Sequence, residues 1–158
     1  MNIIKAIFII YLIGFWFIGC SSAPKQIESD GPIFDPNTAY ESQSDKVKHT
    51  IGNPAVWSLW QKSKQAEADG DLSTAVIQVE RAIRLEGEDA VLWSRLAELN
   101  LKQGNANQAQ ELAKKSNSLA LSDNVLVYRN WLIIAKARRL VGDDIGAEEA
   151  EYTAGTFR

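Results

Sequence analysis

The chain has 158 residues, which suits one modest domain with appended segments. Its formal net charge is −3, so it carries no overall positive field that would recruit nucleic acid. One cysteine and one histidine exclude an internal disulfide and are too few for a soft-ligand metal cluster. We therefore expect no metal site and no cofactor other than a covalent lipid, for the reason given below.

The N-terminus is predicted to be a targeting segment. An unbroken apolar run, residues 6–19, follows Lys5 and ends just before Cys20. Its length is typical of the apolar region of a signal peptide and is shorter than the roughly 20 residues that a membrane-spanning helix needs. An uncleaved anchor helix and a buried core helix are the alternative interpretations.

The stretch "FIGC" followed by "SS" resembles the lipobox of bacterial lipoproteins, although Phe17 stands where that motif usually has Leu. The resemblance implies that residues 1–19 are cleaved as a signal peptide and that Cys20 carries a covalent lipid, which would anchor the chain in a membrane. Ser21 stands where an Asp would signal retention in the inner membrane. The resemblance thus implies the outer membrane, with the protein on its periplasmic face.

Residues 20–52 are predicted to form the lipidated start of the mature chain and a disordered linker. The segment contains three prolines and many small polar residues, and no helical or strand period. The pair Ile33 and Phe34 is either a short contact motif or incidental. His49 has no neighbouring partner residues in the sequence, so we expect it to be solvated.

A helical pattern begins at Asn53 and repeats. Gly70 and Gly104 are 34 positions apart, and a third copy of the pattern follows 38 positions later at Gly142. Such self-similarity indicates a stack of helical pairs. The expected helices are 54–68, 72–86, 89–102, 106–120, 125–141 and 144–156.

These units resemble the tetratricopeptide repeat (TPR), in which two helices are joined by a tight turn. The glycines would take positive φ at the turns, and the next residues, Asp71, Asn105 and Asp143, would cap the second helices. Small residues would let paired helices approach closely, namely Ser63, Ala97 and Ala135 on first helices and Ala75, Ala109 and Ala147 on second helices. The predicted fold is an all-α, TPR-like helix-turn-helix solenoid over residues 53–158, with about three repeats and six helices.

In TPR proteins the first helices line the concave side, and the resemblance implies which residues would face a partner there. The mixture of aromatic and basic side chains suits an extended or helical peptide. For Trp57 the alternative is a core or capping role, for Trp93 and Trp131 a core role, and for the basic residues 136–139 a solvated face. The candidate groove residues are Trp57, Trp60, Lys64, Glu98, Leu101, Lys102, Arg129, Leu132, Lys136 and Arg139.

The repeat region is also similar to small repeat lipoproteins of gammaproteobacteria, the LpoP-type activators of class A penicillin-binding proteins. That resemblance implies a protein partner that synthesises peptidoglycan. An assembly scaffold or pilotin-like lipoprotein for a pilus or secretion system is the second hypothesis, and an envelope protein without a single client is the third.

An apolar stripe on the last helix would permit self-association. We expect no catalytic residue, because the stretch "GDDIGAEEA" is a repeat turn and the acids fall on helix surfaces.

Overall fold

The computed structural model describes residues 51–158. The chain divides into two units, Met1–Ile33 and Phe34–Arg158, and the described residues all belong to the second. The predicted signal peptide, the lipidation site Cys20 and the predicted linker up to Thr50 lie outside the described residues. Those assignments, and the domain boundaries based on them, stay predictions.

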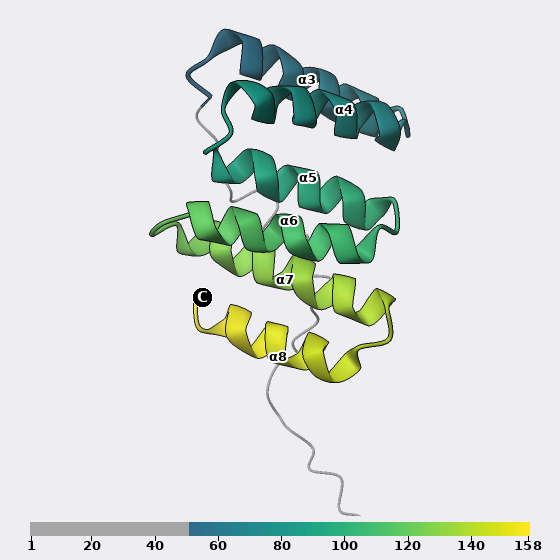
Figure 1. The fold of residues 1–158 in the computed structure, drawn as a ribbon, viewed down its shortest axis with the longest axis vertical. Helices are drawn as coiled ribbons and strands as arrows, with labels where there is room; N and C mark the ends of the chain where they lie inside the picture. Colours follow the sequence, from purple (N-terminus) through teal and green to yellow (C-terminus); the bar gives the residue numbers. More distant parts are fainter. Residues whose placement is uncertain (1–50) are drawn as a thin grey trace, which may run out of the picture. The chain divides into compact units, whose positions relative to one another are not determined.

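The described residues form six α-helices joined by short turns, with no strand among them (Figure 1). Every predicted helix is present, and each boundary agrees with the structure to within one residue. Successive helices pack on each other, and α5 also contacts α7, so that the first helices of neighbouring units meet. The helices are α3 (Pro54–Ala68), α4 (Leu72–Leu85), α5 (Ala90–Lys102), α6 (Ala106–Leu119), α7 (Asn124–Leu140) and α8 (Asp144–Gly155).

The turns within the three helical pairs have the predicted backbone conformation. Gly70, Gly104 and Gly142 have φ values of 79°, 81° and 79°, a region that other L-residues rarely adopt. The turn between α6 and α7 instead places Leu121 at φ 49° with its side chain exposed. Positive φ in the turns before α4, α6 and α8 thus follows from glycine, whereas Leu121 adopts it without that freedom.

The helix caps follow the prediction at two of the three second helices. Asp71 accepts a hydrogen bond from the Thr74 amide, and Asp143 accepts one from the Gly146 amide, both at 2.9 Å. Asn105 occupies the cap position of α6, but its side chain makes no capping hydrogen bond. Asn105 thus takes the predicted position without the capping hydrogen bond, and its amide nitrogen donates to Asn100 and Gln103.

Small side chains allow the helices to pack closely, as predicted. The six small residues at the helix crossings are all fully buried. Larger apolar residues fill the space around them, and the largest cluster joins α5, α6, α7 and α8 around Leu132, Ile133 and Ile134. Burying one such side chain contributes about 1.5–3 kcal/mol. The fully buried small residues are Ser63, Ala75, Ala97, Ala109, Ala135 and Ala147.

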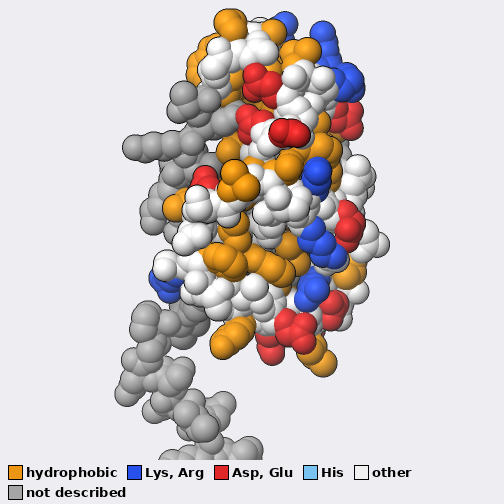
Figure 2. All heavy atoms as spheres, turned by 60° about the vertical axis from the view of Figure 1, so that its left-hand side comes forward, with side chains coloured by type: hydrophobic (Ala, Val, Ile, Leu, Met, Phe, Trp, Pro, Cys, Tyr) orange, Lys and Arg blue, Asp and Glu red, His pale blue; other side chains and the backbone are white. Residues whose placement is uncertain are grey.

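The surface retains several apolar side chains. Figure 2 shows one face, on which hydrophobic side chains lie in separate patches among polar ones. On the last helix, Ala147, Ala150 and Ala154 are buried, whereas Ile145 and Tyr152 are largely exposed. Of the described helices, none combines the length and the apolar character needed to cross a membrane.

Candidate protein-binding face

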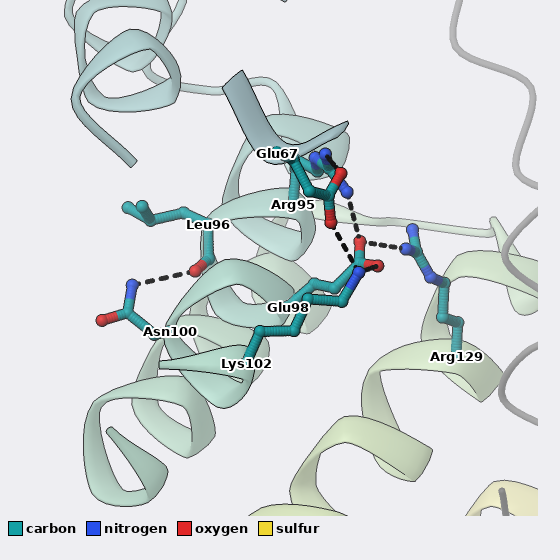
Figure 3. A network of polar contacts seen from close by, with 7 residues as sticks. All are labelled: Glu67, Arg95, Leu96, Glu98, Asn100, Lys102 and Arg129. Atoms are coloured by element: carbon teal, nitrogen blue, oxygen red, sulfur yellow. Dashed lines mark hydrogen bonds and ion pairs between the residues drawn. The ribbon is translucent and has the colours of Figure 1, made fainter. Parts of the chain in front are cut away.

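The first helices of the three pairs are joined by a network of ion pairs (Figure 3). Glu67 comes from α3, Arg95, Glu98 and Lys102 come from α5, and Arg129 comes from α7. On α5 the three charged residues are spaced by three and four positions, which places them on one side of the helix. We call the surface that carries this network the first-helix face.

Glu98 lies at the centre of the network. Its Oε2 accepts from Arg95 at 2.9 Å and from Arg129 at 2.6 Å, and its Oε1 lies 3.1 Å from the Lys102 ammonium. Glu67 extends the network to the first pair: it is bonded to Arg95, and its Oε1 lies 2.5 Å from Lys102. Two carboxylates, one from the first pair and one from the second, thus bind three cations from the second and third pairs.

The charges around Glu98 determine its protonation state. Burial alone would raise its pKa, but Arg129, Arg95 and Lys102 outweigh burial and lower the pKa from 4.5 to about 2. The pKa of Glu67 is also lowered, because hydrogen bonds from Lys102 and Arg95 exceed the opposing effect of its partial burial. Both carboxylates are therefore charged at neutral pH, and the five groups together carry one net positive charge.

Aromatic side chains border the network on α3. The Arg95 guanidinium lies 5.9 Å from the centre of the Trp60 ring, within the range of a cation–π contact. Trp57, one turn earlier on α3, is 49% exposed. This end of the first-helix face thus offers aromatic surface next to positive charge, a combination enriched in protein-binding hot spots.

The predicted groove residues divide by exposure. Trp57, Lys64, Lys102 and Arg139 are exposed, and Trp60, Leu101 and Lys136 are half-buried. Glu98, Arg129 and Leu132 are buried, with relative exposures of 3%, 4% and 0%.

As exposed lining residues, the three buried ones were predicted wrongly. Leu132 packs within the apolar core of α6 to α8, while Glu98 and Arg129 pair with each other inside the network. Arg139 forms an ion pair with Glu151 of α8, which offsets its positive charge.

The structure also bears on the alternative roles considered for Trp57, Trp93 and Trp131. The core role considered for Trp57 is wrong, given its exposure. Trp131 is partly buried against two apolar clusters, in keeping with the core role, and Trp93 is half-buried, with its Nε1 donating to the Gly87 carbonyl at 2.7 Å.

Sequence reasoning missed Arg95, which connects Trp60, Glu67 and Glu98. The available signal was the spacing of Arg95 and Glu98, since oppositely charged residues three apart on a helix face each other. The ion pair of Arg95 with Glu67 on α3 depends on how the first two helical pairs stack, which spacing in the sequence does not give.

A second buried polar cluster fixes α7 against α6. The Asn130 amide donates to the Ser116 hydroxyl at 2.7 Å and to Asn117 at 2.9 Å, and Ser116 donates to the Ala90 carbonyl at the start of α5. Because buried hydrogen bonds require defined geometry, this cluster sets how α5, α6 and α7 meet. Within residues 51–158, no group of three or more His, Cys, Asp or Glu is placed to hold a metal ion.

The architecture and the charged first-helix face define a class: an all-α, TPR-like domain of three helical pairs. Comparison with protein-family models and with the sequences of curated proteins gives no match. Among solved structures, the globular C-terminal domain of LpoP from P. aeruginosa is similar, with a TM-score of 0.64 and 32% sequence identity. The match covers 66% of this chain and 99% of that domain. The chain belongs to the family of this LpoP domain.

Proposed function

We propose that this chain is a lipoprotein of the outer membrane whose TPR-like domain binds and activates a class A penicillin-binding protein in the periplasm. The observation that carries the proposal is the 32% identity across 99% of the LpoP C-terminal domain. The resemblance to LpoP-type activators and the lipobox-like sequence at Cys20 support the same role.

The first-helix face is the surface through which we propose the partner is bound. It combines exposed aromatic and basic side chains, Trp57, Lys64 and Lys102, above a network that holds α3, α5 and α7 in fixed positions. Because the network orders the face before binding, less conformational entropy is lost on association. The domain would act by binding alone, without chemistry of its own.

The proposal is tested with the purified full chain and a purified class A penicillin-binding protein from the same organism. We expect the chain to be retained on the immobilised synthase and to increase the rate of glycan polymerisation by at least twofold. Absence of both effects would contradict the proposal. A deletion strain that loses a surface appendage while its wall synthesis is unchanged would favour the scaffold hypothesis instead.

The lipid anchor is tested separately. Replacement Cys20→Ser removes the thiol that would carry the lipid, so we expect the variant to leave the membrane fraction. If Cys20→Ser still fractionates with the outer membrane, the anchoring part of the proposal is wrong.

A further inference from the structure

The last second helix lacks a neighbour that the other two second helices have. The helices α4 and α6 each pack on the first helix that follows, α5 and α7 respectively. Within the described residues no helix follows α8, which lies at the end of the stack opposite to α3 (Figure 1). The side of α8 that corresponds to the covered sides of α4 and α6 can therefore be located by comparing the three second helices.

On α4 the covered side is apolar. Four of its residues pack in one cluster with Leu96 and Leu99 of α5, and none of the four is exposed. They are spaced by four, three and four positions, which places them along one side of the helix. The four residues are Leu72, Val76, Val79 and Ile83.

On α6 the corresponding side, 34 positions later, is more polar and is covered by α7. Gln110 accepts a hydrogen bond from Arg138 of α7 at 3.3 Å, and Asn117 accepts one from Asn130 of α7 at 2.9 Å. The two residues between them in this row are buried alanines, so again none of the four is exposed. The four residues are Ala106, Gln110, Ala113 and Asn117.

On α8 the same side, 38 positions later still, is acidic and open. It comprises Asp144, Glu148, Glu151 and Gly155, which we call the end face of α8. Three of these four residues are exposed and Glu151 is half-buried, whereas none of their eight counterparts on α4 and α6 is exposed. The end face thus has the register of a helix-packing surface without the helix.

Apolar surface and a hollow lie beside the end face. Ile145 and Tyr152, seven positions apart on α8, are 76% and 81% exposed. A side chain at Gly155 would meet no atom within 4 Å, so this position leaves room for a side chain from outside. The hollow next to it has a volume of about 520 Å³ and is lined by Glu151, Tyr152, Gly155, Thr156 and Arg158.

Negative charge is concentrated at this end of the domain. Residues 140–158 contain five acidic residues and one basic residue, whereas residues 51–139 contain ten acidic and twelve basic ones. Two cations of α7 offset part of the charge: Arg138 pairs with Glu149, and Arg139 pairs with Glu151. The region stays net negative with both of these cations counted, so it attracts a positively charged partner.

We propose that the end face of α8 binds a basic amphipathic helix of a partner protein, in the place that α5 takes on α4 and α7 takes on α6. Lys or Arg side chains of that helix pair with Asp144 and Glu148, and its apolar side packs on Ile145 and Tyr152. Gln110, the counterpart of Glu148 on α6, already receives an arginine from α7. A carboxylate at the same position binds such a cation more strongly than an amide does.

A second copy of the chain is a poorer occupant. Head-to-tail stacking would place α3 of one copy on α8 of the next and would continue without closing. The residues of α3 that stand where α5 has Leu92, Leu96 and Leu99 are all exposed and polar. They supply one cation and no apolar side chain, namely Ser58, Lys62 and Gln65.

The experiment uses the full chain in neutral phosphatidylcholine vesicles, with a photo-reactive benzoyl-phenylalanine in place of Tyr152. The probe is a synthetic peptide of Leu and Lys in amphipathic order, about 18 residues long so that it can form a helix when bound. Two control peptides have Glu in place of Lys, or the same composition without amphipathic order. Mass spectrometry after illumination gives the yield of peptide crosslinked to residue 152.

We expect the amphipathic Lys peptide to crosslink at least fivefold more than either control peptide. The yield should fall at least threefold in about 0.5 M salt, because screening weakens exposed ion pairs. The same photo-reactive residue in place of Lys114, the exposed counterpart of Tyr152 on α6, should give little crosslink. Equal yields at the two positions, or equal yields for the ordered and disordered Lys peptides, would overturn the proposal.

A pair of matched variants identifies the end face. Glu148→Lys reverses an exposed charge on it, and Glu88→Lys makes the same change at an exposed position in the turn before α5. We expect Glu148→Lys to lower the yield at least fivefold and Glu88→Lys to leave it unchanged, with the same thermal unfolding midpoint in both. Equal effects, or crosslinks mainly between two copies of the chain, would contradict the proposal. Binding at the end face does not depend on the proposed function, because no synthase is present in these samples.

Discussion

The first and second helices of the three pairs have different tasks although they alternate along one chain. The first helices α5 and α7 are buried on almost all sides and carry the ionic network, whereas the second helices α4, α6 and α8 bury a narrow stripe of small residues. The buried small residues of the second helices set the spacing between helices. The exposed positions of these helices tolerate many different residues. The chemistry that distinguishes this domain is thus concentrated on the first helices.

The largest expected effect of a single change separates the two kinds of helix. Glu98→Ala leaves the buried Arg95 and Arg129 without their shared carboxylate, which typically costs about 3–5 kcal/mol of unfolding free energy. Glu111 on α6 is exposed and pairs only with its neighbour Lys114, so Glu111→Ala should leave stability nearly unchanged. Urea unfolding of both variants measures the difference. Similar losses in the two variants would remove the distinction between the helices.

Acid should weaken the first-helix network. The pKa of Glu98 is about 2 in the folded chain and near 4.5 in the unfolded chain, so the stabilisation is fully present above about pH 5. It is lost progressively as the pH falls from about 4.5 to about 2, and it amounts to on the order of 3 kcal/mol. Thermal unfolding between pH 7 and pH 2 should show the loss, and Glu98→Gln should show a smaller one over the same range. An identical pH dependence in both proteins would contradict this role for Glu98.

The glycine turns that join first to second helices give an intermediate effect. Gly142 has φ 79°, so Gly142→Ala should cost about 1–2 kcal/mol although the added methyl group meets no neighbouring atom. Gly155 also has open space around it but does not have positive φ, so Gly155→Ala should not destabilise the chain. The midpoints of chemical unfolding compare the two. A loss at Gly155 as large as that at Gly142 would show that backbone conformation is not the cause.

The helix caps give the smallest expected difference. The Asp123 side chain caps α7 through the Leu126 amide at 3.0 Å, so Asp123→Ala should cost about 1 kcal/mol. Asn105 occupies the same position at α6 without a capping bond, and Asn105→Ala should cost clearly less. Amide hydrogen exchange in the first turn of each helix reports the change locally. Faster exchange at α6 than at α7 after these replacements would contradict the assignment of the caps.

The sequence predicted what depends on local spacing. Gly70, Gly104 and Gly142 mark turns because glycine adopts the positive φ that these turns need. The small residues recur at fixed positions between them. The helix boundaries and the all-α fold could be predicted for the same reason.

The site was harder to predict, because burial depends on neighbours that are distant in the sequence. Repeat positions assigned Arg129 and Glu98 to an open surface, yet the close approach of α5 and α7 brings them into contact across 31 positions. Arg95 was missed since its partner Glu67 lies on another repeat unit. Lys64 and Trp57 are exposed on α3, the first helix of the stack, and their contact with a partner stays a prediction.

The central claim is that the first-helix face binds the partner, and one comparison of affinities tests it most directly. The double variant Trp57→Ala, Lys64→Glu changes exposed residues of α3, and the control Ile77→Ala, Arg84→Glu makes matching changes on α4, where Ile77 is 50% exposed, close to the 49% of Trp57. Equilibrium binding of each full-length variant to the immobilised class A penicillin-binding protein gives the two affinities. We predict at least a tenfold loss for the α3 variant and less than a twofold change for the α4 control. Equal losses, or a larger loss for the α4 variant, would contradict the claim.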